Sequence, residues 1–336
     1  MSKLLTVFGA TGNQGGSVIK TILADPELSK EFQIRAVTRN ASKPAARSLA
    51  EQGIEVKTAD MNSKDSVASV IAGSHTVFLV TNFWETRSLE AEVSQGRNVA
   101  DAARDAGVSQ LIFSSLLDVS EHTGGRLAHV PHFDAKAAVE RYIRSICAAS
   151  SSSSSSTDEG GPGLGACTFV LPGYFMSNLP DMLRLVRQGD ESASSLPADE
   201  GMFTLAYPFG PETRIPLIDP AEDTGKFVKA AIKHAAELNG KRLLAAAGYY
   251  TPERILEEFE EVTGNKTAFM QVSPEQYRAY LPANVAQEML ETHLFIADPG
   301  YYAGESLEES LKLLDEKPTT WKEFVRRSNA SGAFQG

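Results

Sequence analysis

Short apolar runs alternate with longer amphipathic stretches through the first half of the chain. Runs with the length and composition of buried strands occur at residues 4–8, 33–37, 54–59, 75–80 and 110–115. The stretches between them place apolar residues at helical spacing, and Gly53, Gly73 and Gly107 stand where a glycine closes a helix shortly before the next strand. Strands that alternate with helices form βαβ units, so the pattern predicts an α/β fold with a Rossmann-type, doubly wound parallel sheet.

The alternation is interrupted by a Ser/Gly-rich run at about residues 148–165. Low-complexity Ser/Gly is typical of a flexible linker, which would place a domain boundary here. The segment "CTFVLPGYF" at 167–175 follows directly and has the composition of one more buried strand. We therefore favour an inserted surface loop between a helix and a sixth strand, and expect the first domain over residues 1–175.

Beyond residue 175 the order of elements changes, and we expect a smaller mixed α/β lobe over residues 176–336, with strands of this lobe free to return to the main sheet. The stretch "MFTLAYPFGPETRIPLI" is interpreted as a hairpin around "PFGPET". A later helix is expected to begin at Thr251 as N-cap, with Pro252 at its first position. A lobe of this kind usually supplies one wall of a ligand pocket.

The first predicted strand ends in the glycine-rich stretch "VFGATGNQGGSVI", with Gly9, Gly12 and Gly15 at three-residue spacing. In this position the first glycine permits a tight turn and the second lets the backbone approach a pyrophosphate. The N–H groups at the start of the following helix then face the anion. The motif predicts dinucleotide binding; a turn that binds nothing is the alternative.

The end of the second strand favours one dinucleotide over the other. An NAD site usually places a carboxylate there for the ribose 2′-hydroxyl, whereas a 2′-phosphate requires a cation. The sequence reads "AVTRNASKP", with Arg39 and Lys43 and no carboxylate. We therefore favour NADP(H), because a guanidinium binds phosphate bidentately; the alternative is that both cations are solvated surface charges.

Composition and charge exclude several classes of protein. The chain has 336 residues, of which 42% are hydrophobic and 22% charged, as in ordinary globular proteins. A net charge of −11 argues against direct nucleic-acid binding. Neither a secretion signal nor an apolar run of about 20 residues is found, so we expect a soluble cytoplasmic protein, with a nuclear location also open. The two cysteines, Cys147 and Cys167, fit a reducing compartment, and a redox role for them stays open.

The motifs together resemble the NmrA-like family, an atypical branch of the short-chain dehydrogenase/reductases, and within it the NADPH redox-sensor proteins. The resemblance covers about residues 3–325 apart from the Ser-rich insertion. It is carried, in this order, by "GATGNQGGSVI", "VTRN", "LVTNFWE", "FSSL", "HFDAK" and "LPGYF".

The resemblance implies NADP(H) as the cofactor and assigns residues to each of its parts. The pyrophosphate is assigned to Gly9, Ala10, Thr11, Gly12, Asn13, Gln14 and Gly15, and the 2′-phosphate to Arg39 and Lys43. By the same resemblance, Asp60 and Met61 lie near adenine, Thr81, Asn82 and Phe83 along the loop after the fourth strand, Lys136 near the nicotinamide ribose, and Gly173, Tyr174 and Phe175 over the nicotinamide.

The segment "HFDAK" holds the candidate catalytic residues, His132 and Lys136. In related dehydrogenases a tyrosine four residues before the lysine delivers the proton, and a serine at the end of the fifth strand, here Ser114 or Ser115, polarises the carbonyl. Beside the Lys136 ammonium, an imidazole is expected to be neutral and a poorer acid. We favour the interpretation in which His132 is a first-turn helix residue after Pro131 and Lys136 serves the cofactor; a catalytic His132 is the alternative.

These observations predict an NADP(H)-binding regulator that senses the cofactor or redox state through an impaired catalytic pair and acts on a protein partner. The alternative is an NADPH-dependent oxidoreductase that reduces a small carbonyl, quinone or imine. A third possibility is an interaction protein that holds the dinucleotide as a permanent structural ligand. No metal site is expected, because the histidines lack metal-ligand spacing, and both a monomer and a dimer stay open.

Overall fold

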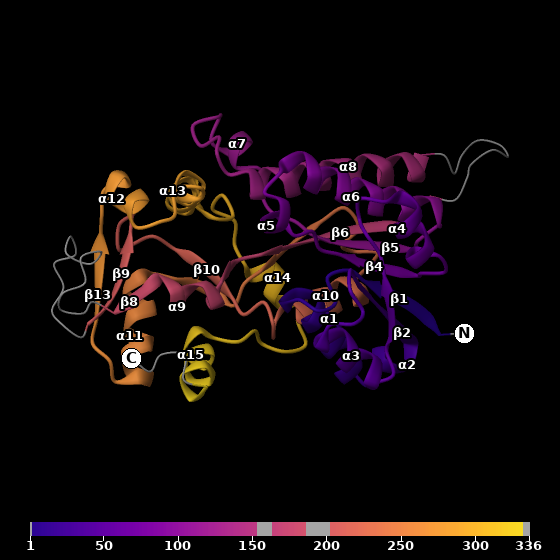
Figure 1. The fold of residues 1–336 in the computed structure, drawn as a ribbon, viewed down its shortest axis with the longest axis horizontal. Coiled ribbons are helices and arrows are strands. Elements are labelled where there is room, and N and C mark those ends of the chain that lie inside the picture. The colour runs from indigo at the N-terminus through magenta and orange to yellow at the C-terminus, as the bar shows by residue number, and fades with distance from the viewer. Residues whose placement is uncertain (1, 153–162, 186–201, 332–336) are drawn as a thin grey trace.

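A computed structural model describes residues 2–152, 163–185 and 202–331 (Figure 1). The Ser/Gly-rich run is described in part: residues 148–152 continue a long helix, and residues 153–162 lie outside the described residues. No helix within the described part of the chain has the length and apolar character needed to span a membrane.

The main sheet is parallel throughout and has seven strands. Their order is β11 (Arg242–Ala245), β6 (Ala166–Pro172), β5 (Gln110–Ser114), β4 (Thr76–Leu79), β1 (Lys3–Val7), β2 (Phe32–Thr38) and β3 (Glu55–Thr58). This is the doubly wound sheet that the sequence predicts. The direction of winding reverses between β1 and β4, and ligands of such sheets bind at that point, outside the carboxyl ends of the strands.

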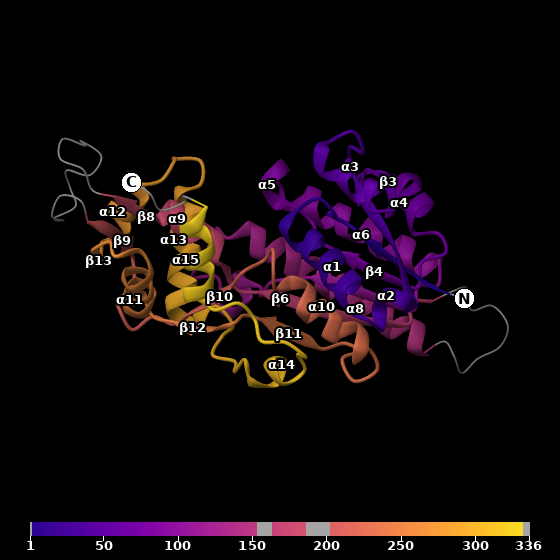
Figure 2. The ribbon, with the colours of Figure 1, turned by 90° about the horizontal axis from the view of Figure 1, so that it is seen from below.

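Helices cover both faces of the main sheet (Figures 1 and 2). One face carries α1 (Asn13–Ala24), α2 (Leu28–Glu31), α3 (Pro44–Glu51) and α10 (Thr224–Lys233), and the other carries α4 (Lys64–Ile71), α6 (Leu89–Asp105) and α8 (Pro131–Ser152). The predicted helix-closing glycines have the expected left-handed conformation, with φ of 81° at Gly53, 76° at Gly73 and 66° at Gly107. Short helices α5 (Phe83–Thr86) and α7 (Val119–His122) lie in the loops after β4 and β5.

The segment "CTFVLPGYF" forms β6, which pairs with β5 of the same sheet, and then the two-residue strand β7 (Tyr174–Phe175). Elements beyond residue 175 also contribute to the main sheet, because β11 pairs with β6 and α10 packs on α1. Cys147 and Cys167, on α8 and β6, are both buried and form no disulfide with one another.

A second lobe, at the left of Figure 1, contains two three-stranded sheets. One has the order β12 (Gly248–Tyr250), β10 (Ile215–Ile218), β7, and the other the order β13 (Thr267–Gln271), β9 (Phe203–Tyr207), β8 (Leu183–Leu185). The other described helical elements beyond residue 175, apart from α10, are η2 (Met176–Asn178), α9 (Leu179–Met182), α11 (Pro252–Thr263), α12 (Pro274–Ala279), α13 (Ala286–Phe295), a π-helical turn (Ile296–Gly300), α14 (Glu308–Lys312) and α15 (Trp321–Ala330). Of these, α14 packs on β11 of the main sheet.

The predicted hairpin around "PFGPET" is wrong, because its two strands belong to different sheets: β9 pairs with β8 and β13, whereas β10 pairs with β7 and β12. Each strand satisfies its backbone groups with a distant partner instead of with its neighbour in sequence. The start of α11 follows the prediction, since the Thr251 side chain accepts a hydrogen bond from the Arg254 backbone N–H and Pro252 occupies the first turn.

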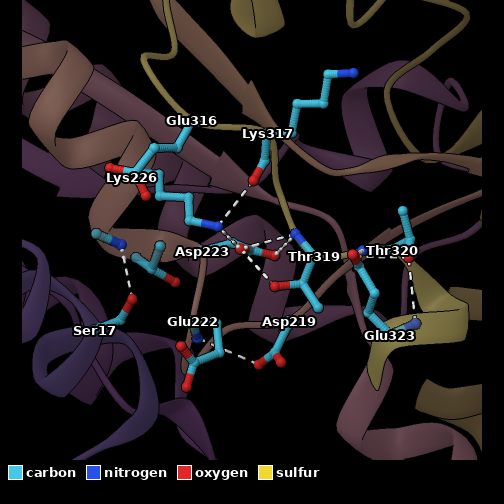
Figure 3. Close-up of polar contacts among 12 residues, drawn as sticks. Ser17, Asp219, Glu222, Asp223, Lys226, Glu316, Lys317, Thr319, Thr320 and Glu323 are labelled. Atoms are coloured by element: carbon cyan, nitrogen blue, oxygen red, sulfur yellow. Dashed lines mark hydrogen bonds and ion pairs between the residues drawn. The ribbon is translucent and has the colours of Figure 1, made fainter. Parts of the chain in front are cut away.

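A buried carboxylate fastens the C-terminal segment to the main domain (Figure 3). Asp223, which is 0% exposed, accepts hydrogen bonds from the backbone N–H and hydroxyl of Thr319 and forms an ion pair with Lys226. Burial raises the pKa of Asp223, while Lys226 and Thr319 act in the opposite direction. Thr320 then begins α15 with a capping box, which sets the direction in which the chain returns to pack on α11.

Candidate functional site

The glycine-rich turn connects β1 to α1 with the geometry of an anion site. Gly9 has a φ of 66°, a conformation that favours glycine, and a Cβ on Gly15 would lie 2.3 Å from the Gly9 carbonyl oxygen. Helix α1 begins after Gly12 without a side-chain cap and without an acidic residue in its first turn. The first N–H groups of the helix and the positive end of its dipole therefore face the space above the strand ends.

A cleft of about 790 Å³ opens at this edge of the sheet, between the β1, β2 and β4 ends. Its size is that of a pocket for a cofactor-sized ligand. Of the residues assigned to the cofactor from sequence, the cleft is lined by Gly9, Thr11, Gly12, Asn13, Gln14, Gly15, Arg39, Lys43, Met61, Thr81, Asn82 and Phe175. The lining also includes residues that sequence reasoning did not select, namely Phe8, Val37, Thr38, Asn40, Ala59, Val80 and Glu85.

The remaining assigned residues do not line this cleft. Ala10 and Phe83 are each 2% exposed and belong to the packing beneath the cleft wall. Asp60 lines an adjacent cavity of about 420 Å³, where its carboxylate accepts hydrogen bonds from the backbone and side-chain N–H groups of Asn62. Gly173 packs so closely that a Cβ would lie 2.4 Å from the Pro216 carbonyl oxygen. Tyr174 is largely enclosed, and burial raises its pKa to about 12.

Arg39, at the end of β2, forms an ion pair with Glu85 of α5. The sequence-based argument for NADP(H) rested on the absence of a carboxylate from the stretch at the end of β2, and it did not anticipate Glu85. Glu85 is distant in sequence and reaches Arg39 only when the loop after β4 folds over the end of β2. Both side chains are exposed, and Lys43 has no ion-pair partner within the described residues.

Lys136 is held by a buried carboxylate. Its Nζ lies 2.7 Å from Glu92 Oε1, 2.8 Å from Thr81 Oγ1 and 3.1 Å from the Thr81 carbonyl oxygen. The Glu92 side chain is 1% exposed and the Lys136 side chain 12%. Glu92 is not among the residues selected from the sequence. A glutamate on the buried face of an amphipathic helix nevertheless indicates a nearby cationic partner, because buried carboxylates are rare without one.

His132 is the second residue of α8, after Pro131, a position that the structural and the catalytic interpretations share. Its Nδ1 contacts Glu288 on α13 of the second lobe, and both side chains are largely buried. The ring also packs on Trp84 and Phe133, with centroids 5.0 Å and 4.9 Å away. The expectation about His132 considered only its neighbour Lys136 and did not include Glu288. Lys136 has a separate carboxylate partner in Glu92.

The two serines at the end of β5 have different environments. Ser114 Oγ donates to the Gln14 side-chain oxygen over 2.8 Å, which places it beside the glycine-rich turn. Ser115 Oγ donates to Glu140 of α8 over 2.6 Å, within a network that also holds Arg144 and Arg242. Only Ser114 is therefore positioned next to the cleft residues.

A glycine-rich turn at the first strand–helix junction of a doubly wound parallel sheet, with an open cleft at the switch point, defines a Rossmann-type α/β protein. The sequence profile of the NmrA-like family matches residues 1–325, and the chain belongs to this family.

Known relatives and solved structures agree with this assignment. The chain is 31% identical over 281 residues to the NmrA-like family domain-containing oxidoreductase ptmS of Penicillium ochrochloron, covering 81% of this chain and 76% of that protein. The fold is similar to that of NmrA, a negative transcriptional regulator solved in complex with NADP, with a TM-score of 0.75, 20% identity and 98% of each chain covered. It is also similar to the Citrobacter sp. triphenylmethane reductase complexed with NADP(H), with a TM-score of 0.70, 22% identity and coverage of 96% and 99%.

Proposed function

We propose that this chain binds NADP(H) in the cleft at the switch point of the main sheet and acts as a cofactor-sensing regulator. The observation that carries the binding proposal is the combination of an uncapped α1 N-terminus, a close-packed Gly9–Gly15 turn, and Arg39 and Lys43 on one cleft wall. The pyrophosphate would accept hydrogen bonds from the backbone N–H groups of the turn, and the two cations suit a 2′-phosphate.

The regulatory part of the proposal rests on how the family's catalytic positions are used. Lys136 is neutralised by Glu92, and His132, in place of the tyrosine, joins the main domain to α13 through Glu288. A second histidine–glutamate contact lies beside it, because Glu291 accepts hydrogen bonds from the backbone and ring nitrogens of His129. These side chains connect the edge of the cofactor cleft to the second lobe, which is the arrangement a cofactor sensor requires.

The cofactor would act on the contacts between the α7–α8 region and α13, by shifting an equilibrium between a state in which they are formed and a state in which they are changed. A ligand shifts such an equilibrium only by its difference in affinity for the two states. NADPH would contact the cleft side of Thr81, and the hydroxyl and carbonyl oxygens of Thr81 accept hydrogen bonds from Lys136 of α8 on the other side. A single residue would therefore separate the bound cofactor from α8. The protein partner would then bind the surface at the junction of α7, α8 and α13.

Limited proteolysis and partner capture with and without NADPH test the regulatory proposal. We expect NADPH to protect the segment before α8 and to change the set of captured proteins. A Glu288→Gln variant should lose the NADPH-dependent difference in proteolysis while it keeps NADPH affinity. Identical cleavage and capture with and without NADPH would contradict sensing and leave binding intact.

A second candidate function is an NADPH-dependent reductase of a small carbonyl, quinone or imine. It is favoured by the His132–Glu288 contact, because a carboxylate that orients an imidazole is the arrangement of a general acid, and by the oxidoreductase names of relatives. The bound cofactor would supply hydride. His132 would deliver a proton, Ser114 would polarise the acceptor oxygen, and Lys136 would bind the nicotinamide ribose.

NADPH oxidation across carbonyl, quinone and imine panels distinguishes the two candidates. A reductase should turn over at least one substrate, and His132→Phe should reduce the rate by about 10²-fold or more while NADPH binding persists. An absence of turnover in all three panels, with NADPH bound, favours the regulator.

A further inference from the structure

Arg39 and Glu85 approach one another across the mouth of the cleft. Arg39 follows β2, and Glu85 lies in α5, the short helix after β4. Both side chains line the cleft as well as the adjacent cavity that contains Asp60. Their exposed fractions are 57% and 42%, so the ion pair faces solvent and is accessible to a ligand.

The position of this pair corresponds to the part of the cleft where an adenine ribose would present its 2′ substituent, if the proposed function holds. In NAD sites a carboxylate at this place accepts a hydrogen bond from the 2′-hydroxyl, whereas in NADP sites an arginine binds the 2′-phosphate. This chain has both groups, one on each wall, and in the described structure they neutralise one another.

We propose that Glu85 is a specificity-determining residue that responds to the 2′ substituent of the dinucleotide. A 2′-hydroxyl leaves the Arg39–Glu85 pair in place and donates a hydrogen bond to the Glu85 carboxylate. A 2′-phosphate binds the Arg39 guanidinium in place of Glu85, because a dianion attracts the guanidinium more strongly than a carboxylate does. The phosphate also repels the Glu85 carboxylate from the mouth of the cleft. This inference rests on the proposed dinucleotide binding and adds to it how the two cofactors are distinguished.

A displacement of Glu85 would move α5, the short helix that carries it, and this movement can be followed through a tryptophan on the same helix. Phe83 is buried and anchors the start of α5, and Arg87 ends it with a φ of 51°. Trp84, the residue before Glu85, is 45% exposed and packs against the His132 ring. The other tryptophan in the sequence, Trp321, is 0% exposed in the second lobe, so Trp84 is the indole that senses a movement of α5.

Calorimetric titration of the whole chain with NADP⁺ and with NAD⁺ tests the proposal. In Glu85→Gln, NADP⁺ should bind about two- to fivefold more tightly, since an exposed ion pair no longer has to be broken, and NAD⁺ should bind more weakly. The matched control is Glu90→Gln, because Glu90 is exposed, lies on the next helix and contacts Ser88 instead of Arg39. It should leave both affinities unchanged.

The titrations distinguish a failure of the proposed role of Glu85 from a failure of dinucleotide binding itself. An NADP⁺-to-NAD⁺ affinity ratio that is the same in wild type and Glu85→Gln, with both cofactors bound, would overturn the role of Glu85 and leave the proposed function standing. A wild-type chain that binds neither dinucleotide would overturn the proposed function itself and the inference with it.

Tryptophan emission provides a second measurement with cofactor fragments. Adenosine 2′,5′-bisphosphate should shift the emission, adenosine 5′-monophosphate should not, and the shift should be absent in Trp84→Phe. Equal responses to the two nucleotides, or a shift that persists in Trp84→Phe, would contradict the displacement of α5.

Discussion

The Lys136 ammonium lies 2.7 Å from the Glu92 carboxylate, and both side chains are largely enclosed between α6 and α8. Lys136, which the proposed function assigns to the nicotinamide ribose, is therefore held in place by a buried carboxylate. Thr81 completes this arrangement, because its hydroxyl contacts both charged groups and its residue lines the cleft. Thr81 therefore connects the cleft to the buried Lys136–Glu92 pair.

Replacing Glu92 by alanine should destabilise the fold by about 3 kcal/mol, because removal of one partner leaves the other as an uncompensated buried charge. Urea unfolding monitored by circular dichroism measures the change. Glu90→Ala on the exposed side of the same helix should cost less than about 0.5 kcal/mol. Equal midpoints for the two variants would show that Glu92 is not the partner on which Lys136 depends.

The sequence identifies Lys136, Arg39 and His132 as important, but it does not identify their carboxylate partners. Each partner comes from an element far along the chain, so its approach is decided by how strands and helices pack and not by local spacing. Glu85 and Glu92 come from the loop and helix after β4, and Glu288 from the second lobe. Local patterns, in contrast, were sufficient for the main sheet, because each βαβ unit has its own periodicity and its own closing glycine.

The second lobe was less predictable for a related physical reason. The sequence "PFGPET" has the composition of a hairpin turn, yet β9 and β10 pair with strands from other parts of the chain. Turn residues allow a reversal of direction without specifying which strands pair afterwards. The return of a strand to the main sheet, which the sequence left open, is made by β11 beside β6.

Gly15→Ala should disrupt the turn and weaken NADPH binding strongly, because the new Cβ would lie 2.3 Å from the Gly9 carbonyl oxygen. Gly16→Ala is the matched control: there the nearest atom is 3.7 Å away, and alanine in a helix is favoured over glycine by about 1 kcal/mol. We expect a lower melting temperature for the first variant and an unchanged or higher one for the second. The reverse order would contradict the close packing of the turn.

The stability of the fold should depend on pH through His293. This residue is buried on α13, and burial lowers its pKa to about 4 even though a hydrogen bond to the Met289 carbonyl oxygen acts in the opposite direction. An unfolded histidine has a pKa of about 6.5, so between these values the unfolded chain binds a proton that the folded chain does not. The free energy of unfolding should therefore fall by about 3 kcal/mol as the pH decreases from about 6.5 to about 4.

His293→Asn isolates that contribution, because asparagine has no titrating group while its amide occupies the place of Nδ1. Unfolding free energies measured at a series of pH values should decrease less steeply in the variant than in wild type across this range. Parallel profiles would mean that His293 has the same pKa in the folded and unfolded chain and that other groups determine the slope.

Asp223→Ala should destabilise the protein by about 3 kcal/mol, since it leaves the Thr319 N–H and the Lys226 ammonium without their carboxylate (Figure 3). The adjacent Glu222 pairs with exposed Lys20, so Glu222→Ala should cost less than about 1 kcal/mol. Denaturant unfolding compares the two variants. Proteolysis of Asp223→Ala should also begin in the C-terminal segment, and cleavage that begins elsewhere would argue against Asp223 as its anchor.

NADP(H) binding in the cleft at the switch point, with Arg39 at the 2′-phosphate, is tested by calorimetric titration with NADPH and NADH on wild type and on Arg39→Met. We expect saturable NADPH binding that weakens about tenfold or more in Arg39→Met, whereas NADH affinity changes little, because a bidentate arginine–phosphate contact contributes about 1.5–3 kcal/mol. Absence of NADPH binding, or NADH binding that is tighter than NADPH binding in wild type, would contradict it.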